Sequence, residues 1–102
     1  MKNVTIDYAE FCAHLDDAAP PSAITPELVA LWWERRGEWD AAHKIVQDIE
    51  TAAAARVHAY LHRVEGDLEN AAYWYKRAGQ RVCELELREE WDALVRSLLQ
   101  SP

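Results

Sequence analysis

Apolar residues recur along the chain at gaps of three and four positions, the spacing of an amphipathic α-helix. Four stretches follow this spacing: Tyr8-Phe11-Cys12-Leu15, Ala42-Ile45-Val46-Ile49, Leu68-Ala71-Ala72-Tyr75 and Leu87-Trp91-Leu94-Val95-Leu98. No stretch of similar length alternates apolar and polar residues as a half-buried strand does. The pattern therefore predicts an all-α protein.

The three glycines of the chain mark expected helix ends. Each follows a basic residue within three positions, and a cation in the last turn complements the negative end of the helix dipole. A glycine just beyond that turn can adopt the left-handed conformation that closes a helix. Thr25, followed by Pro26 and Glu27, has the residue order of a helix start. These signals predict about six helices, near residues 6–17, 26–36, 39–50, 52–65, 68–78 and 85–99.

Two segments of the chain resemble each other. The sequence that begins at Gly37 (GEWDAA) aligns with the one at Gly66 (GDLENA), an offset of 29 residues. Residues 66–78 resemble the second helix of a tetratricopeptide (TPR) repeat, because Ala71, Tyr75 and Ala78 match the small, aromatic and small positions of that family. The resemblance covers about residues 26–78. It departs from the family in its offset, since regular TPR arrays repeat about every 34 residues.

The resemblance implies two stacked helical hairpins within one domain, residues 1–102. Ala42 and Ala71 would let neighbouring helix axes approach closely. Stacked hairpins leave apolar surface at both ends, which terminal elements must cover. The helices near 6–17 and 85–99 are the expected caps. Because the offset is short, the sequence leaves open whether the hairpins form a TPR-type groove.

Charge and composition exclude several classes of protein. The chain has 11 Lys and Arg against 18 Asp and Glu, a net charge of −7, whereas nucleic-acid binders present a basic face. No apolar run reaches the roughly 18 residues of a membrane span, and no signal segment is expected at the Met1 end. Cys12 and Cys83 form no disulfide framework. We therefore expect an acidic cytoplasmic protein with no nucleic-acid or membrane partner.

Aromatic residues give the leading functional hypothesis, a small non-catalytic protein that binds a peptide or protein partner without a cofactor. Adjacent helical residues point in different directions, so at least one of Tyr73, Trp74 and Tyr75 should be partly exposed, and Trp74 is the expected binding residue, with Tyr73 contributing. Exposed aromatic side chains often anchor partners. In the TPR family the first helix of each hairpin lines the concave groove, so the resemblance implies that Arg56, Tyr60 and Arg63 contribute to the same partner-binding surface.

The five tryptophans also bear on the core. Trp32 and Trp33 cannot both lie at the centre of one buried face. Trp33 falls on the aromatic position of the TPR pattern and is expected in the core with Trp39 and Tyr75.

An alternative hypothesis is a metal- or small-ligand-binding protein. His58 and His62 are four residues apart, and Glu65 follows three later, so all three share one helix face, as a metal pair requires. Ala59 replaces the glutamate of the zinc-protease motif. His43 and His14 would join only if the fold brought them close, and the two histidines are otherwise packing residues.

A third hypothesis is a homodimer in which the aromatic face serves self-association. The sequence leaves monomer and homodimer open.

Overall fold

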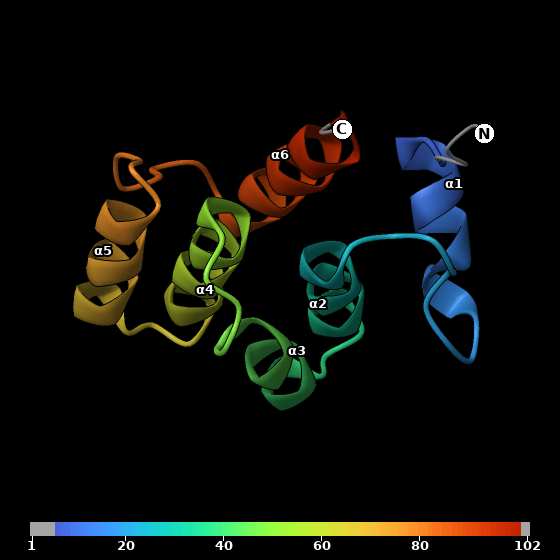
Figure 1. Cartoon of the computed structure of the whole chain (residues 1–102), viewed down its shortest axis with the longest axis horizontal. Coiled ribbons are helices and arrows are strands. Elements are labelled where there is room, and N and C mark those ends of the chain that lie inside the picture. The colour runs from blue at the N-terminus through green and yellow to red at the C-terminus, as the bar shows by residue number, and fades with distance from the viewer. Residues whose placement is uncertain (1–5, 101–102) are drawn as a thin grey trace.

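The computed structural model describes residues 6–100, in which the chain forms helices and no strand. The elements are α1 (Tyr8–Ala13), the 3-10 turn η1 (His14–Asp16), α2 (Pro26–Arg35), α3 (Trp39–Val46), α4 (Ala52–Val64), α5 (Leu68–Arg77) and α6 (Leu87–Gln100) (Figure 1). The all-α prediction is confirmed. None of these helices is both long enough and apolar enough to cross a membrane. Residues 1–5 and 101–102 lie outside the described part of the chain. The expected domain, residues 1–102, and the expected lack of a signal segment at Met1 both extend into these residues.

Helix boundaries follow the signals in the sequence. The Thr25 side chain accepts a hydrogen bond from the Leu28 amide at the start of α2. Gly37 and Gly66 both have a φ of +86°, the left-handed conformation that closes a helix at low cost only with glycine. The third helix ends at Val46 and not near residue 50, because residues 47–50 connect it to α4, which Thr51 caps.

The middle of the chain folds as two helical hairpins, α2–α3 and α4–α5 (Figure 1). Helix α4 lies between α3 and α5, and α1 lies beyond α2. Ala42 and Ala71 are 0% and 1% exposed. Small side chains at these two positions therefore face tightly packed neighbours, as the sequence predicts.

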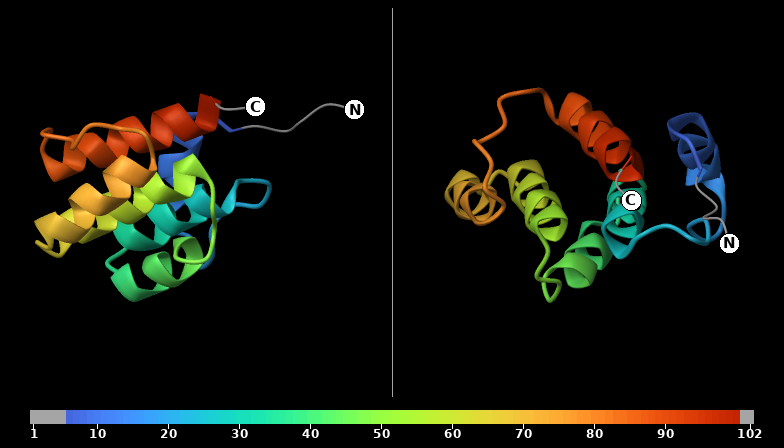
Figure 2. Two further views of the ribbon diagram at one scale, coloured as in Figure 1. Left: turned by 60° about the vertical axis from the view of Figure 1, so that its left-hand side comes forward. Right: turned by 45° about the horizontal axis from the view of Figure 1, so that its top comes forward.

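Helix α6 does not cover the outer side of α5. It runs across α4 and α2 (Figure 2), where Trp91 donates an indole N–H bond of 3.0 Å to the Leu31 carbonyl. Leu94 and Val95 are buried in the same cluster. The terminal helix thus completes the central core, and the outer face of α5 is left open to solvent.

The tryptophans of α2 are placed the other way round from the expectation. Trp32 is fully buried and donates to the His14 carbonyl at 3.0 Å, whereas Trp33 is half-buried. The reason is the register of the helix, since Leu28, Leu31 and Trp32 follow the i, i+3, i+4 spacing of one buried stripe. Trp39 is also half-buried, and Tyr75 is buried as expected.

Candidate metal centre

The candidate site residues of α4 divide between two opposite faces of the helix. At about 100° per residue, Arg56, Tyr60 and Arg63 share one face, and His58 and His62 point the other way. The first face lies against α6 and α2, while the second lies between α3 and α5. The structure therefore separates Arg56 and Arg63 from Tyr73 and Trp74 of α5.

The arginine face is occupied by the chain itself. Arg63 forms an ion pair with the buried Glu90 of α6 and donates to the Leu85 carbonyl at 2.7 Å. Tyr60 is 3% exposed and donates to Glu34 at 3.0 Å. Burial raises the pKa of the Tyr60 hydroxyl. Arg56 likewise contacts α6, through the Ser97 hydroxyl at 3.3 Å. In this fold, these three residues contribute to internal contacts.

Tyr73 and Trp74 lie on α5 with a different arginine. Tyr73 is 51% exposed, and its hydroxyl accepts a hydrogen bond of 3.1 Å from Arg77. The Arg77 guanidinium also lies 5.2 Å from the centre of the Trp74 ring. The Trp74 indole stacks on the imidazole of His58, with ring centres 3.9 Å apart and planes at 16°. Trp74 therefore packs against His58 on the side of α4 that faces α5.

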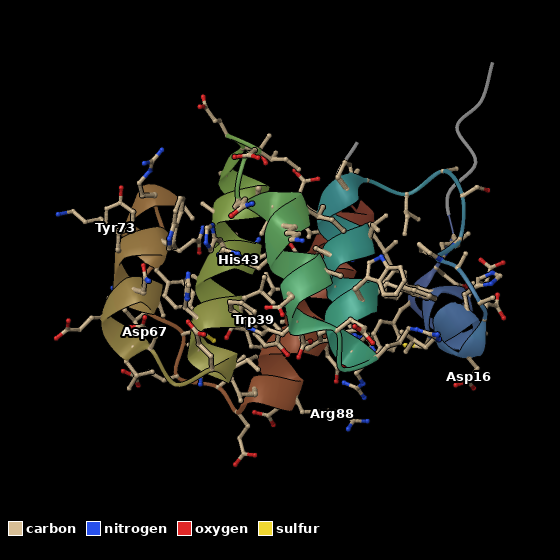
Figure 3. All side chains as sticks on the ribbon, turned by 90° about the horizontal axis from the view of Figure 1, so that it is seen from below. Asp16, Trp39, His43, Asp67, Tyr73 and Arg88 are labelled. Atoms are coloured by element: carbon tan, nitrogen blue, oxygen red, sulfur yellow. The ribbon has the colours of Figure 1, made fainter. Side chains whose placement is uncertain are left out.

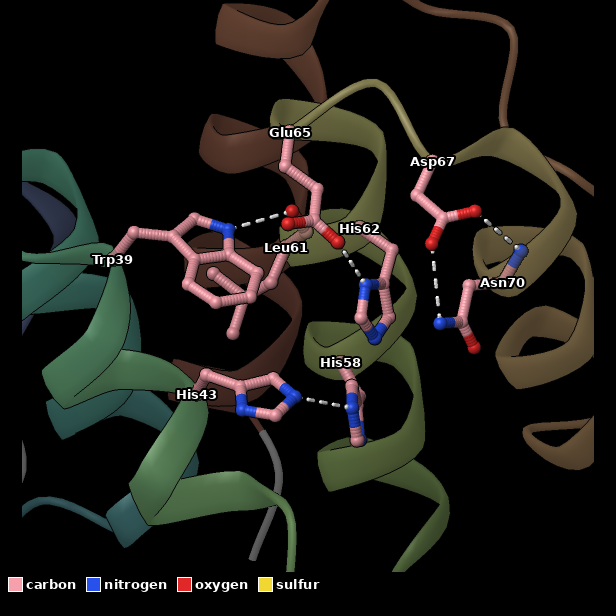
Figure 4. Close-up of polar contacts among 8 residues, drawn as sticks. All are labelled: Trp39, His43, His58, Leu61, His62, Glu65, Asp67 and Asn70. Carbon is pink, nitrogen blue, oxygen red and sulfur yellow. Dashed lines mark hydrogen bonds and ion pairs between the residues drawn. The ribbon is translucent and has the colours of Figure 1, made fainter.

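Three histidines converge between α3 and α4. His43 of α3 joins His58 and His62, and each offers a ring nitrogen within 4.8 Å of the others. The Nε2 atoms of His43 and His58 are 2.9 Å apart (Figure 4). Seen from below, the His43 side chain points from α3 toward α4 (Figure 3). His14 lies elsewhere, with its Nδ1 2.7 Å from Asp17.

Glu65 orients one of the three rings. Its carboxylate is 2.7 Å from Nδ1 of His62, and a carboxylate only accepts, so the Nδ1–H group donates this hydrogen bond. In the neutral tautomer with this N–H, the lone pair of His62 lies on Nε2. Proteins that bind metals through histidine use such a carboxylate to fix the ring and its tautomer. Glu65 therefore fits the role of a supporting residue, which differs from its expected role as a direct ligand.

His58 carries a buried nitrogen without a hydrogen-bond partner. The residue is 4% exposed, and its Nδ1 forms no hydrogen bond. Burial and the neighbouring His43 and His62 lower its pKa to about 4. Burial also lowers the pKa of His43, with His62 contributing. Near neutral pH these two imidazoles are uncharged, which is the form that coordinates a metal ion.

The geometry is close to that of a coordination site. Tetrahedral Zn²⁺ with bonds of about 2.0–2.1 Å holds its nitrogen ligands roughly 3.3 Å apart. The His43–His58 separation of 2.9 Å is slightly short of this value, and all three nitrogens lie within 4.8 Å of one another. Side-chain shifts of about an ångström would therefore centre the three nitrogens on one ion.

The sequence alone does not place His43 in the cluster. The sequence feature that points to His43 is its spacing from Trp39 in α3, because the two residues are one turn apart and share the face toward α4. Their rings stack, with centres 4.9 Å apart and planes at 9°, and the Trp39 indole donates to the Leu61 carbonyl of α4 at 2.7 Å. This contact fixes the position of α3 along the axis of α4 and so places His43 opposite His58.

Comparison with known proteins adds no family to this description. No family model matches the chain, and neither the curated proteins nor the solved structures yield a significant match.

Proposed function

We propose that this is a binding protein whose functional centre holds one divalent transition-metal ion on His43, His58 and His62. The observation that carries the proposal is the convergence of three imidazole rings, each with a nitrogen within 4.8 Å of the others. The Nδ1 atom of His58 is also buried without a hydrogen-bond partner. Buried polar atoms are nearly always paired in folded proteins. The 2.9 Å contact between the His43 and His58 Nε2 atoms uses one ring N–H as its donor. A bound cation would displace that proton and accept the lone pairs of all three rings.

The donor set favours a metal that prefers imidazole. Nitrogen ligands of this kind suit Zn²⁺, Cu²⁺, Ni²⁺ and Co²⁺, whereas Mg²⁺ and Ca²⁺ take oxygen ligands. Neither cysteine contributes, since both lie outside the group of three histidines. Zn²⁺ is therefore the first ion to test.

Metal binding would link the two hairpins, because His43 belongs to α2–α3 and the other two ligands to α4–α5. A ligand that binds only the folded state at a hundred times its Kd stabilises that state by about 2.7 kcal/mol. For a domain of this size, such a gain raises Tm by roughly 10 °C or more.

The test is zinc titration of the metal-free protein by calorimetry, with Tm measured in parallel. We expect one Zn²⁺ per chain and a rise in Tm that a chelator reverses. The His43→Ala variant should bind Zn²⁺ at least about 100-fold more weakly, since it loses one of three ligands. His43 is half-buried, so the variant should keep its helical circular dichroism.

His14→Ala is the matched control, because the His14 ring is partly exposed, lies 2.7 Å from Asp17 and is outside the group of three histidines. It should bind zinc as the parent protein does. A parent chain that takes up no zinc, or a His43→Ala variant with unchanged affinity, contradicts the proposal.

A second candidate function is partner binding on the open face of α5. Tyr73 is 51% exposed on this face, and Arg77 supports its ring. Leu68, at the start of α5, is 66% exposed. This surface keeps one residue of the peptide- or protein-binding hypothesis, Tyr73, whereas Trp74 is turned toward His58 of α4. Two free cysteines support a reducing, cytoplasmic setting for it.

Sedimentation velocity separates the forms of this second proposal. A concentration-dependent dimer that Tyr73→Ala abolishes supports self-association through α5. A chain that stays monomeric at all concentrations contradicts the homodimer. The partner of this face would then be a different protein.

A further inference from the structure

We infer that the metal on His43, His58 and His62 keeps one open coordination position, which takes a small monodentate ligand such as water, hydroxide or azide. The inference rests on the proposed function and specifies the kind of centre: an exchangeable site in place of a closed structural one.

The first step is the count of protein donors. Within residues 6–100, the group that includes His43, in which every ligand atom lies within 4.8 Å of the others, contains three histidines and no carboxylate or thiol. Structural zinc sites are closed by four protein ligands, whereas sites with three protein ligands leave the fourth position to water or another molecule. Three histidines therefore define the open type.

The second step concerns the two acidic side chains nearest the cluster. Glu65 and Asp67 come close to His62, but as a separate group that includes neither His43 nor His58. Glu65 is held by the His62 Nδ1 atom at 2.7 Å. Asp67 caps α5, accepting from the amide and the side chain of Asn70, both at 3.2 Å (Figure 4). Using either carboxylate as a fourth ligand would break these contacts.

The third step is the size of the incoming ligand. The Trp74 indole covers one face of the His58 ring at 3.9 Å, and the Trp39 indole covers a face of the His43 ring at 4.9 Å. His58 and His62 are buried, and His43 is half-buried. Access is therefore from the His43 side, between two large rings, which suits a ligand of a few atoms.

The experiment uses the full chain loaded with Co²⁺, whose visible absorption reports the number and type of its ligands. Sodium azide is the probe. We expect azide to change the spectrum saturably, with one azide bound per cobalt. The His14→Ala chain should respond in the same way.

Linkage gives an independent readout. If azide binds the metal in the site, azide raises the affinity of the protein for Co²⁺. By reciprocity, the protein raises the affinity of Co²⁺ for azide by the same factor. Azide at ten times its Kd should lower the apparent Kd for Co²⁺ about tenfold, after correction for azide binding by free cobalt.

The outcomes separate this inference from the proposed function. A chain that binds one Co²⁺, but whose spectrum and cobalt affinity are both unchanged by saturating azide, has a closed centre, and the open position is refuted while metal binding stands. A chain that binds neither Zn²⁺ nor Co²⁺ refutes the metal centre itself.

Discussion

The two faces of α4 carry polar residues in similar numbers and use them in opposite ways. On the face toward α6, unlike groups meet: the Arg63 guanidinium and the Tyr75 hydroxyl both donate to the Glu90 carboxylate. On the face toward α3, like groups meet, since His43, His58 and His62 are all bases. Complementary pairs satisfy each other and stabilise the fold. The three histidines are satisfied only in part, because His43 and His58 share one hydrogen bond while the His58 Nδ1 atom has no partner. Groups with perturbed pKa values cluster at functional sites.

The largest expected effect on stability comes from truncating the buried Trp91, on the side of α4 that faces α6. Trp91 is 1% exposed and its indole N–H is bonded, so Trp91→Ala should lower the free energy of unfolding by about 3–5 kcal/mol. Urea denaturation followed by circular dichroism measures this loss. Trp74→Ala is the matched substitution on the histidine side, and it should cost less than about 2 kcal/mol, because Trp74 is only half-buried. Equal losses would mean that both faces are structural.

The next effect concerns the buried charge on the α6 side. Arg63→Met should cost roughly 2–3 kcal/mol, because it leaves the Glu90 carboxylate buried without its cation. Adding Glu90→Gln to this variant removes the unpaired charge and should recover part of the loss while keeping a partner for Tyr75. If the double variant is less stable than Arg63→Met, the charge is not the cause of the loss.

The smallest effect is a pH dependence on the histidine side. The folded pKa of His58, about 4, lies below its ordinary value of 6.5. As pH falls below 6.5, the unfolded chain therefore binds a proton that the folded chain refuses, and stability decreases. By pH 4.5 this loss should be on the order of 2 kcal/mol in metal-free protein.

The measurement compares urea denaturation of the parent and of His58→Gln between pH 7 and 4.5, with a chelator present. The carboxylates titrate in both proteins, so the difference between the two curves isolates His58. Parallel curves would contradict the lowered pKa.

Local rules account for most of the fold. Gly37, Gly66 and Thr25 act at short range, through backbone conformation and capping, and a reading of the sequence places the helix ends that they control to within a residue or two. Helix α3 ends early because the connection to Thr51 needs those residues, which is a tertiary requirement. The resemblance to TPR hairpins stays a prediction, since it rests on residues 26–78 alone.

The site shows where sequence reasoning stops. The positions of His58 and His62 on one helix face follow from their spacing, and so does their separation from Arg56 and Arg63. The contribution of His43 depends on how far α3 is shifted along α4, which the Trp39 contact decides. The course of α6 across α4 is also a long-range choice, and it turns the expected binding residue Tyr60 into a core residue.

The stacking of Trp74 on His58, with ring centres 3.9 Å apart, has an optical consequence. An imidazole that gains a positive charge, or gives its lone pair to a paramagnetic ion, quenches the emission of an indole in contact with it. The Trp74 emission should therefore decrease when His58 is protonated or when a paramagnetic ion such as Co²⁺ binds at the proposed centre, and no external label is needed to follow either event.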